Sequence, residues 1–94
     1  MALYSVRYAY GADLEKRLSF RAEHRTFLKT LYEQGIILAC GPFTDDADPG
    51  GQLLIRADSA ATALELLGGD PYLANQVVDE VEVREWTTVY SLWD

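Results

Sequence analysis

Apolar residues recur at every second position near the start of the chain and at helical spacing shortly after it. The alternation through Tyr4, Val6 and Tyr8 predicts a strand over residues 3–10. From residue 19 to residue 34, apolar side chains recur every three or four positions, which predicts an amphipathic helix. Ser19 is the expected N-cap and Gly35 the expected C′ residue, although residues 14–17 could add an earlier turn.

Two uninterrupted apolar segments follow this helix. They predict strands over residues 36–43 and 52–57, separated by a turn over residues 44–51 that is rich in aspartate and glycine. The three aspartates of this turn lack the ligand spacing and the closing glutamate of a calcium-binding EF-hand loop. We therefore expect a solvated turn there and no metal site.

The last third of the chain predicts two short helical segments and a final strand. Ser59 is expected to cap a helix that ends at Gly68. Aspartate directly before proline is typical of a helix start, so Asp70 should cap a further helical turn that begins at Pro71. Alternation resumes over residues 77–89 and breaks at Glu85-Trp86, which predicts a long strand with a bulge at that point.

The expected order of elements is therefore β-α-β-β-α-β. Right-handed crossovers place both helices on the same face of a sheet. The predicted fold class is α+β, with a ferredoxin-like four-stranded antiparallel sheet and helices on one face.

The two middle strands do not show the alternation expected when one sheet face meets water. Residues 36–40 and 53–55 are apolar without interruption. Either these strands are simply rich in apolar residues, or the second sheet face is covered by another copy of the chain. We expect the latter, a homodimer packed through the sheet face. Cys40, within the first apolar run, is expected to be a buried thiol.

Composition narrows the range of functions. At 94 residues with 49% hydrophobic content, the chain is expected to form a single globular domain over residues 1–94. Eight basic and fifteen acidic residues give a net charge of −7, which disfavours nucleic-acid binding. No segment has the length of a membrane span, and the first ten residues lack the pattern of a signal peptide. These features predict a cytoplasmic protein that binds neither nucleic acid nor membrane.

His24 is the only histidine in the chain, and it lies on the apolar stripe of the predicted first helix. On a helical wheel of about 100° per residue, it falls on the same side of the helix as Phe20, Phe27 and Leu28. An imidazole facing an apolar interior needs hydrogen-bond partners, and it exchanges protons readily near neutral pH. It is either a core histidine bonded to a backbone carbonyl or a group that takes part in function. A lone histidine with scattered carboxylates has no metal-ligand spacing, so no metal is expected.

The chain resembles the YCII-related proteins in two segments, LEKRLSFRAEHRTFLKTLYEQGIILACGP and GGDPYLAN. These are small bacterial proteins with the dimeric α+β barrel fold, akin to muconolactone isomerase, and the resemblance extends from residue 3 to about residue 86. It implies that His24 and Asp70 form an active-site dyad and that Gly41 and Pro42 belong to the site. The chain departs from many relatives in two respects. Ala22 stands where these relatives have proline. The turn over residues 44–51 is often shorter than the corresponding turn of the relatives, and this difference leaves the shape of the pocket rim and the identity of the substrate open.

The resemblance implies a cofactor-free lyase, isomerase or dehydrohalogenase that acts on a small hydroxylated ring or enol. A carboxylate that accepts from one imidazole nitrogen leaves the other nitrogen free as a base. The alternative is a non-catalytic module that binds a metabolite or a protein partner in the same cleft. Haem-degrading monooxygenase chemistry is a third possibility on this fold.

Three further residues are candidates for the same cleft. Arg21 lies at the edge of the apolar stripe, either as a solvated flank or as a contact for an anionic substrate. Tyr72, two positions after Asp70, is expected to form a wall of the cleft and to contact the substrate. The roles of Arg17 and of residues 87–94 stay open.

Overall fold

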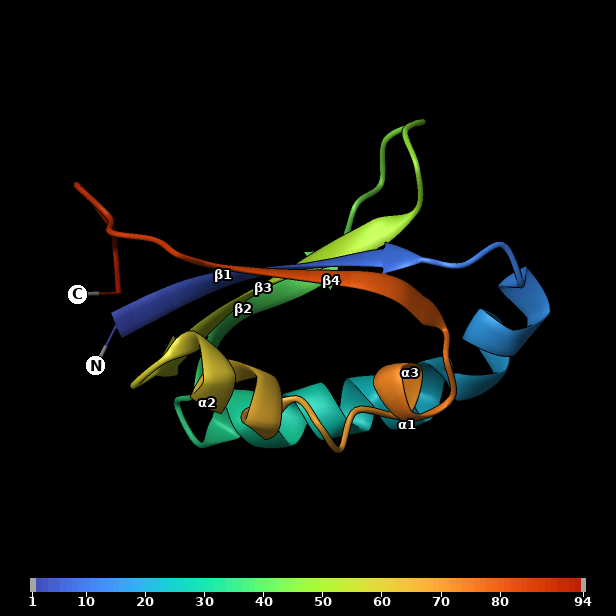
Figure 1. Cartoon of the computed structure of the whole chain (residues 1–94), viewed down its shortest axis with the longest axis horizontal. Coiled ribbons are helices and arrows are strands. Elements are labelled where there is room, and N and C mark those ends of the chain that lie inside the picture. The colour runs from blue at the N-terminus through green and yellow to red at the C-terminus, as the bar shows by residue number, and fades with distance from the viewer. Residues whose placement is uncertain (1, 94) are drawn as a thin grey trace.

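A computed structural model describes residues 2–93, which form an antiparallel sheet with helices packed against one face (Figure 1). The strands are ordered β2-β3-β1-β4 and every neighbouring pair is antiparallel. This arrangement confirms the predicted ferredoxin-like α+β fold. The elements are β1 (Ala2–Tyr10), α1 (Leu14–Glu33), β2 (Ile37–Pro42), β3 (Gly50–Ala57), α2 (Ala60–Leu66), α3 (Pro71–Ala74) and β4 (Val78–Glu85).

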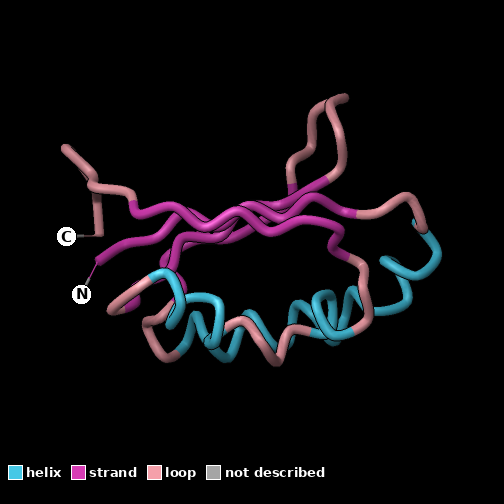
Figure 2. Tube along the Cα trace, viewed as in Figure 1, coloured by secondary structure: helices cyan, strands magenta, loops and turns pink. Residues whose placement is uncertain are grey.

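The sheet and the helices form two separate layers (Figure 2). The hydrophobic core lies between these two layers. The period-two face of β1 points into it, because Tyr4, Val6 and Tyr8 are all buried. Leu28 and Leu31 of α1 pack against this face. The alternation along β1 and the helical spacing along α1 therefore bury the residues that the sequence pattern predicts.

The N-cap of the first helix is Asp13, six residues before Ser19, and residues 14–17 form the earlier turn that the sequence also allows. Asp13 caps α1 by accepting a hydrogen bond from the backbone N–H of Lys16 at 3.0 Å, while the Ser19 hydroxyl donates to the Lys16 carbonyl from within the helix. Residues 11–13 separate β1 from α1, and the aspartate at the end of this segment begins the helix before the chain reaches Ser19. None of the helices in residues 2–93 is both long and apolar enough to cross a membrane.

The other predicted helix boundaries are confirmed. Gly35 follows α1 with φ +77°, the left-handed conformation that glycine adopts without steric cost. Ser59 caps α2 by accepting from the backbone N–H of Thr62 at 3.1 Å. Asp70 caps α3, with Pro71 in the first helical turn.

The last strand ends at Glu85, so the predicted extension to residue 89 is wrong. Its pairing partner β1 begins at Ala2, and the pair Tyr4–Glu85 is the last in register before the Trp86 N–H donates to the Leu3 carbonyl at 2.8 Å. The irregularity in this ladder lies at Ala9/Tyr10, not at residues 85–86.

The sheet face that carries no helices is mixed in character. It is polar along β1 and β4, where Arg7 stands opposite Glu82, but apolar at Leu54 of β3, which is only 8% exposed. The predicted lack of alternation therefore holds only along β2 and β3. Cys40 is exposed, contrary to the predicted burial, because its side chain lines an open pocket and is not part of the packed core.

Candidate active site

His24 is buried in the middle of α1 and hydrogen-bonded to a carboxylate from another element. Its Nδ1 lies 2.7 Å from Oδ1 of Asp70, which precedes α3 and has no exposed surface. An ionised carboxylate can only accept hydrogen bonds, so Nδ1 is the protonated ring nitrogen. The contact that the family resemblance implies, between residues 46 positions apart, is therefore present.

Asp70 accepts three hydrogen bonds, and they use both of its carboxylate oxygens. Oδ1 accepts from His24 and from the backbone N–H of Tyr72 at 3.0 Å, while Oδ2 accepts from the Tyr8 hydroxyl at 2.9 Å. A buried carboxylate is tolerated only with such a set of donors. Asp70 thus caps α3 and orients His24 at the same time.

Tyr8 is a member of this network that the sequence pattern does not identify. Burial, followed by the negative charge of Asp70, holds the pKa of the Tyr8 phenol far above its usual value. Tyr8 therefore remains a hydrogen-bond donor to Asp70 at any physiological pH. Its place on the inward face of β1 is visible in the sequence, but nothing there indicates that its hydroxyl meets a residue 62 positions away.

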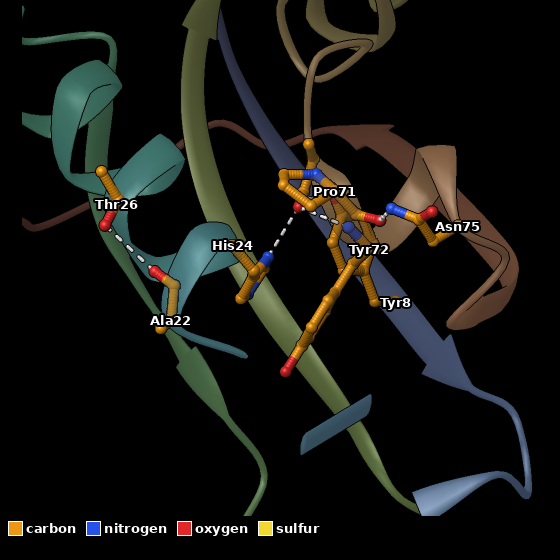
Figure 3. A network of polar contacts seen from close by, with 8 residues as sticks. Tyr8, Ala22, His24, Thr26, Pro71, Tyr72 and Asn75 are labelled. Atoms are coloured by element: carbon orange, nitrogen blue, oxygen red, sulfur yellow. Dashed lines mark hydrogen bonds and ion pairs between the residues drawn. The ribbon is translucent and has the colours of Figure 1, made fainter. Parts of the chain in front are cut away.

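Aromatic contacts fix the plane of the His24 ring. The Tyr72 ring stacks on it with the centroids 3.7 Å apart and the planes within 3° (Figure 3). Tyr10 meets Tyr72 edge to face at 5.6 Å, and the Arg17 guanidinium lies 5.0 Å from the centroid of the Tyr10 ring. These contacts join α1, β1 and α3 around the imidazole and restrict its rotation.

A cavity of about 600 Å³ opens beside His24, bounded by α1, β1 and the ends of β2 and β3. The predicted site residues Arg21, Gly41, Pro42 and Tyr72 line it together with His24. Asp70 lies behind the imidazole and does not reach the cavity wall. Because Nδ1 is bonded to Asp70, the ring nitrogen available to a ligand is Nε2.

Two glycines allow the hairpin of β2 and β3 to approach β1 at this cavity. A Cβ at Gly50 would collide with the backbone carbonyl of Tyr8, and one at Gly51 would lie 2.8 Å from the Tyr10 hydroxyl. Gly41 has no such neighbour within 4 Å. The close approach therefore depends on the glycines of β3 and not on the glycine of the Gly41-Pro42 pair.

Sequence comparison relates most of the chain to a known family. The YCII-related domain matches residues 1–87. The YciI proteins of Escherichia coli O6:H1 and of Shigella flexneri are each 33% identical over 97 residues, which cover 94% of this chain and 99% of those proteins.

Solved structures with a similar fold are also found. The 5-chloro-2-hydroxyhydroquinone dehydrochlorinase TftG of Burkholderia phenoliruptrix, solved with 2,5-dihydroxybenzoquinone, superposes with a TM-score of 0.76 at 24% identity over 90% of this chain and 93% of its own. Rv0793 of Mycobacterium tuberculosis superposes with a TM-score of 0.57 at 13% identity over 97% of both chains. These likenesses support the fold, and the sequence matches show that the chain belongs to the YCII-related domain family.

Proposed function

We propose that this protein is a small-molecule enzyme that transfers protons through His24, without a cofactor, on a small hydroxylated ring or enol. The observation that carries the proposal is the 2.7 Å hydrogen bond from His24 Nδ1 to Asp70 beside a cavity of about 600 Å³. That bond fixes the imidazole tautomer and leaves Nε2 unprotonated where a ligand can reach the ring.

The chemical step follows from this arrangement. Nε2 accepts a proton from a hydroxyl or a carbon of the substrate, and the electron pair of the broken bond moves into the ring or enol. In an isomerase the imidazolium returns the proton to another carbon. In a lyase or dehydrohalogenase the electron pair expels a leaving group, and the imidazolium later releases its proton to solvent. The negative charge of Asp70 stabilises the imidazolium in either case.

The structural neighbour supports this class of reaction. TftG is a dehydrochlorinase of a chlorinated hydroxyhydroquinone, and its ligand is a dihydroxybenzoquinone. The aromatic walls of the present cavity, formed by Tyr10, Phe43 and Tyr72, suit a planar ring of that kind. We propose that Arg21, Gly41, Pro42 and Tyr72 contact the substrate.

We propose further that the protein is a homodimer joined through the helix-free sheet face. No helix covers that face in residues 2–93, and the segment after β4 exposes apolar side chains, among them Val89 at 84% and Tyr90 at 95%. Burial of such side chains by a second copy would stabilise the pair. The relatives come from bacteria, and we propose one domain over residues 1–94 in a bacterial cytoplasm.

Two substrates test the catalytic proposal. With hydroxyhydroquinone in D₂O under anaerobic conditions, the wild type should incorporate deuterium at ring carbons faster than buffer does. With 5-chloro-2-hydroxyhydroquinone it should release chloride. His24→Gln should abolish both activities, and Lys16→Gln, on the same helix but outside the cavity lining, should retain them.

The outcomes separate an enzyme from a binding module. Binding of either ring to the wild type without any exchange or chloride release would favour the non-catalytic alternative. Equal rates in wild type and His24→Gln would refute a role for the imidazole as the base.

A further inference from the structure

Half of the basic residues of this acidic chain gather at one cavity. Arg17, Arg21, Arg25 and Lys29 recur every fourth position along α1, and all four line the cavity, whereas the chain has only eight lysines and arginines. No aspartate or glutamate among the described residues lines it, although the chain carries fifteen. The cavity is therefore a basic surface within a protein of net charge −7.

The stability of α1 does not account for these four basic residues, which form a basic stripe along the helix. Like charges four residues apart on a helix repel one another, by about 0.2–0.5 kcal/mol per pair. Arg17 also lies near the helix N-terminus, where the helix dipole disfavours a cation. Within residues 2–93, none of the four side chains forms an ion pair with a carboxylate of the chain. Repulsion within the stripe costs stability, and no carboxylate among residues 2–93 offsets its charge through an ion pair, as expected of a surface that meets an anion.

The N-terminal half of the stripe is the half that connects to His24. Arg17 packs over the Tyr10 ring, Tyr10 contacts Tyr72, and Tyr72 stacks on His24. Burial and the neighbouring Tyr72 raise the pKa of Tyr10, and the positive charges of both Arg17 and Arg21 act in the opposite direction. Both guanidinium groups are thus close enough to influence the Tyr10 hydroxyl, within the cavity wall.

We propose that the substrate of this site is a small aromatic or enolic acid, whose carboxylate binds Arg17 and Arg21 while its ring lies beside His24. Arg21 precedes His24 by three residues and Arg17 by seven, a rise of about 4.5 Å and about 10 Å along the helix. A ring with one attached carboxylate spans this interval, and arginine is well suited to bind a carboxylate through paired hydrogen bonds. The ring assignment rests on the proposed function, but the recognition of the acid does not.

Binding of a matched pair of probes tests the proposal. 2,5-Dihydroxybenzoate and hydroquinone share a 1,4-dihydroxylated ring and differ only in the carboxylate. Calorimetry should show the acid binding at least about tenfold more tightly to the wild type, because a charge-assisted pair contributes on that order. The double variant Arg17→Gln/Arg21→Gln should lose this preference and bind both probes alike. Lys16→Gln removes a charge next to Arg17 from a side chain outside the cavity lining and should retain the preference.

The experiment is repeated in a His24→Gln background, where proton transfer is removed. A retained preference for the acid there supports the acid site even if the catalytic proposal fails. Equal binding of both probes to the wild type, or binding of neither, would overturn the proposal. So would a preference that survives the double variant, that disappears equally in Lys16→Gln, or that depends instead on Arg25 and Lys29. Circular dichroism and urea unfolding verify that each variant is folded.

Discussion

Asp70 combines an ordinary structural role with a chemical one. As the N-cap before Pro71 it is readable from two adjacent residues, since aspartate and proline at those positions begin a helix. Its contact with His24 is not readable in that way, because no local pattern relates residues 46 positions apart, and only the family resemblance implies it. The sequence does not reveal the role of the Tyr8 hydroxyl for the same reason. A tyrosine on an inward strand face looks like any other core residue until its neighbour is known.

Substitution of Asp70 separates its two roles. Asparagine caps helices about as well as aspartate, so Asp70→Asn should keep most of the stability while the charge that supports an imidazolium is lost. Asp70→Ala removes the cap and also leaves buried donors of His24 and Tyr8 without a partner, which should cost at least about 2 kcal/mol. Urea unfolding measures both variants. Equal stability of Asp70→Ala and Asp70→Asn would contradict the network described here.

Tyr8 predicts how stability depends on alkaline pH. Its pKa is raised in the folded protein, so the folded state keeps a proton that the unfolded chain releases above pH 10. The unfolded state then binds fewer protons, and the free energy of unfolding must fall as pH rises. Each such tyrosine contributes a slope of up to about 1.4 kcal/mol per pH unit.

Urea unfolding between pH 9 and pH 11 tests this dependence. Tyr8→Phe should show a shallower decline than the wild type, with a residual slope from Tyr10, whose pKa is also raised. Tyr90→Phe is the matched control because Tyr90 is almost fully exposed. An unchanged slope in Tyr8→Phe would argue against the buried phenol.

At the level of helices and strands, the sequence predicts the end of an element where a capping residue marks it. It does not predict the end of a strand that depends on pairing with a neighbouring strand. Ser59 and Gly35 act at the positions where their chemistry predicts. β4 ends at Glu85, where its regular pairing with β1 stops at Tyr4, and the break in alternation at Glu85-Trp86 does not distinguish such an end from a bulge. The sequence places the start of α1 at Ser19 or one turn earlier, and only the earlier start, after the Asp13 cap, brings Arg17 onto the helix with Arg21, Arg25 and Lys29.

The approach of β3 to β1 predicts opposite effects for two glycines at the cavity. Gly50→Ala places a methyl group against the Tyr8 carbonyl and should destabilise the fold by about 1–3 kcal/mol. Gly41→Ala meets open space and should change stability by less than about 0.5 kcal/mol. Urea midpoints of the two variants provide the comparison. Comparable losses at both positions would mean that the hairpin is not held as described.

On the scale of the whole molecule, the fold and the assembly differ in how well the sequence predicts them. The order of elements and the handedness of crossovers leave few arrangements, and the ferredoxin-like sheet follows from them. The proposed dimer uses a face whose character is set by strand register. That face proves polar along β1 and β4 and apolar at Leu54, a pattern that apolar runs in β2 and β3 alone could not indicate.

The proposed homodimer predicts the mass of the protein in solution. Sedimentation equilibrium at micromolar concentration should give twice the 10.5 kDa mass of one chain. Arg7→Glu reverses a charge at the centre of the helix-free face, opposite Glu82, and should weaken the dimer. Lys16→Glu, on α1, is the control for the same charge reversal. A monomer at these concentrations would contradict the proposed interface.

The tautomer of His24 tests most directly whether the site holds a base. His24 is the only histidine, so histidine labelled with ¹⁵N gives ring signals from this residue alone. Long-range proton–nitrogen correlation spectra at pH 8, where an ordinary imidazole is neutral, should show a protonated Nδ1 and an unprotonated Nε2. The Nε2 signal should move when 2,5-dihydroxybenzoate is added. A protonated Nε2 with a bare Nδ1 would contradict the hydrogen bond to Asp70 and with it the proposed proton transfer.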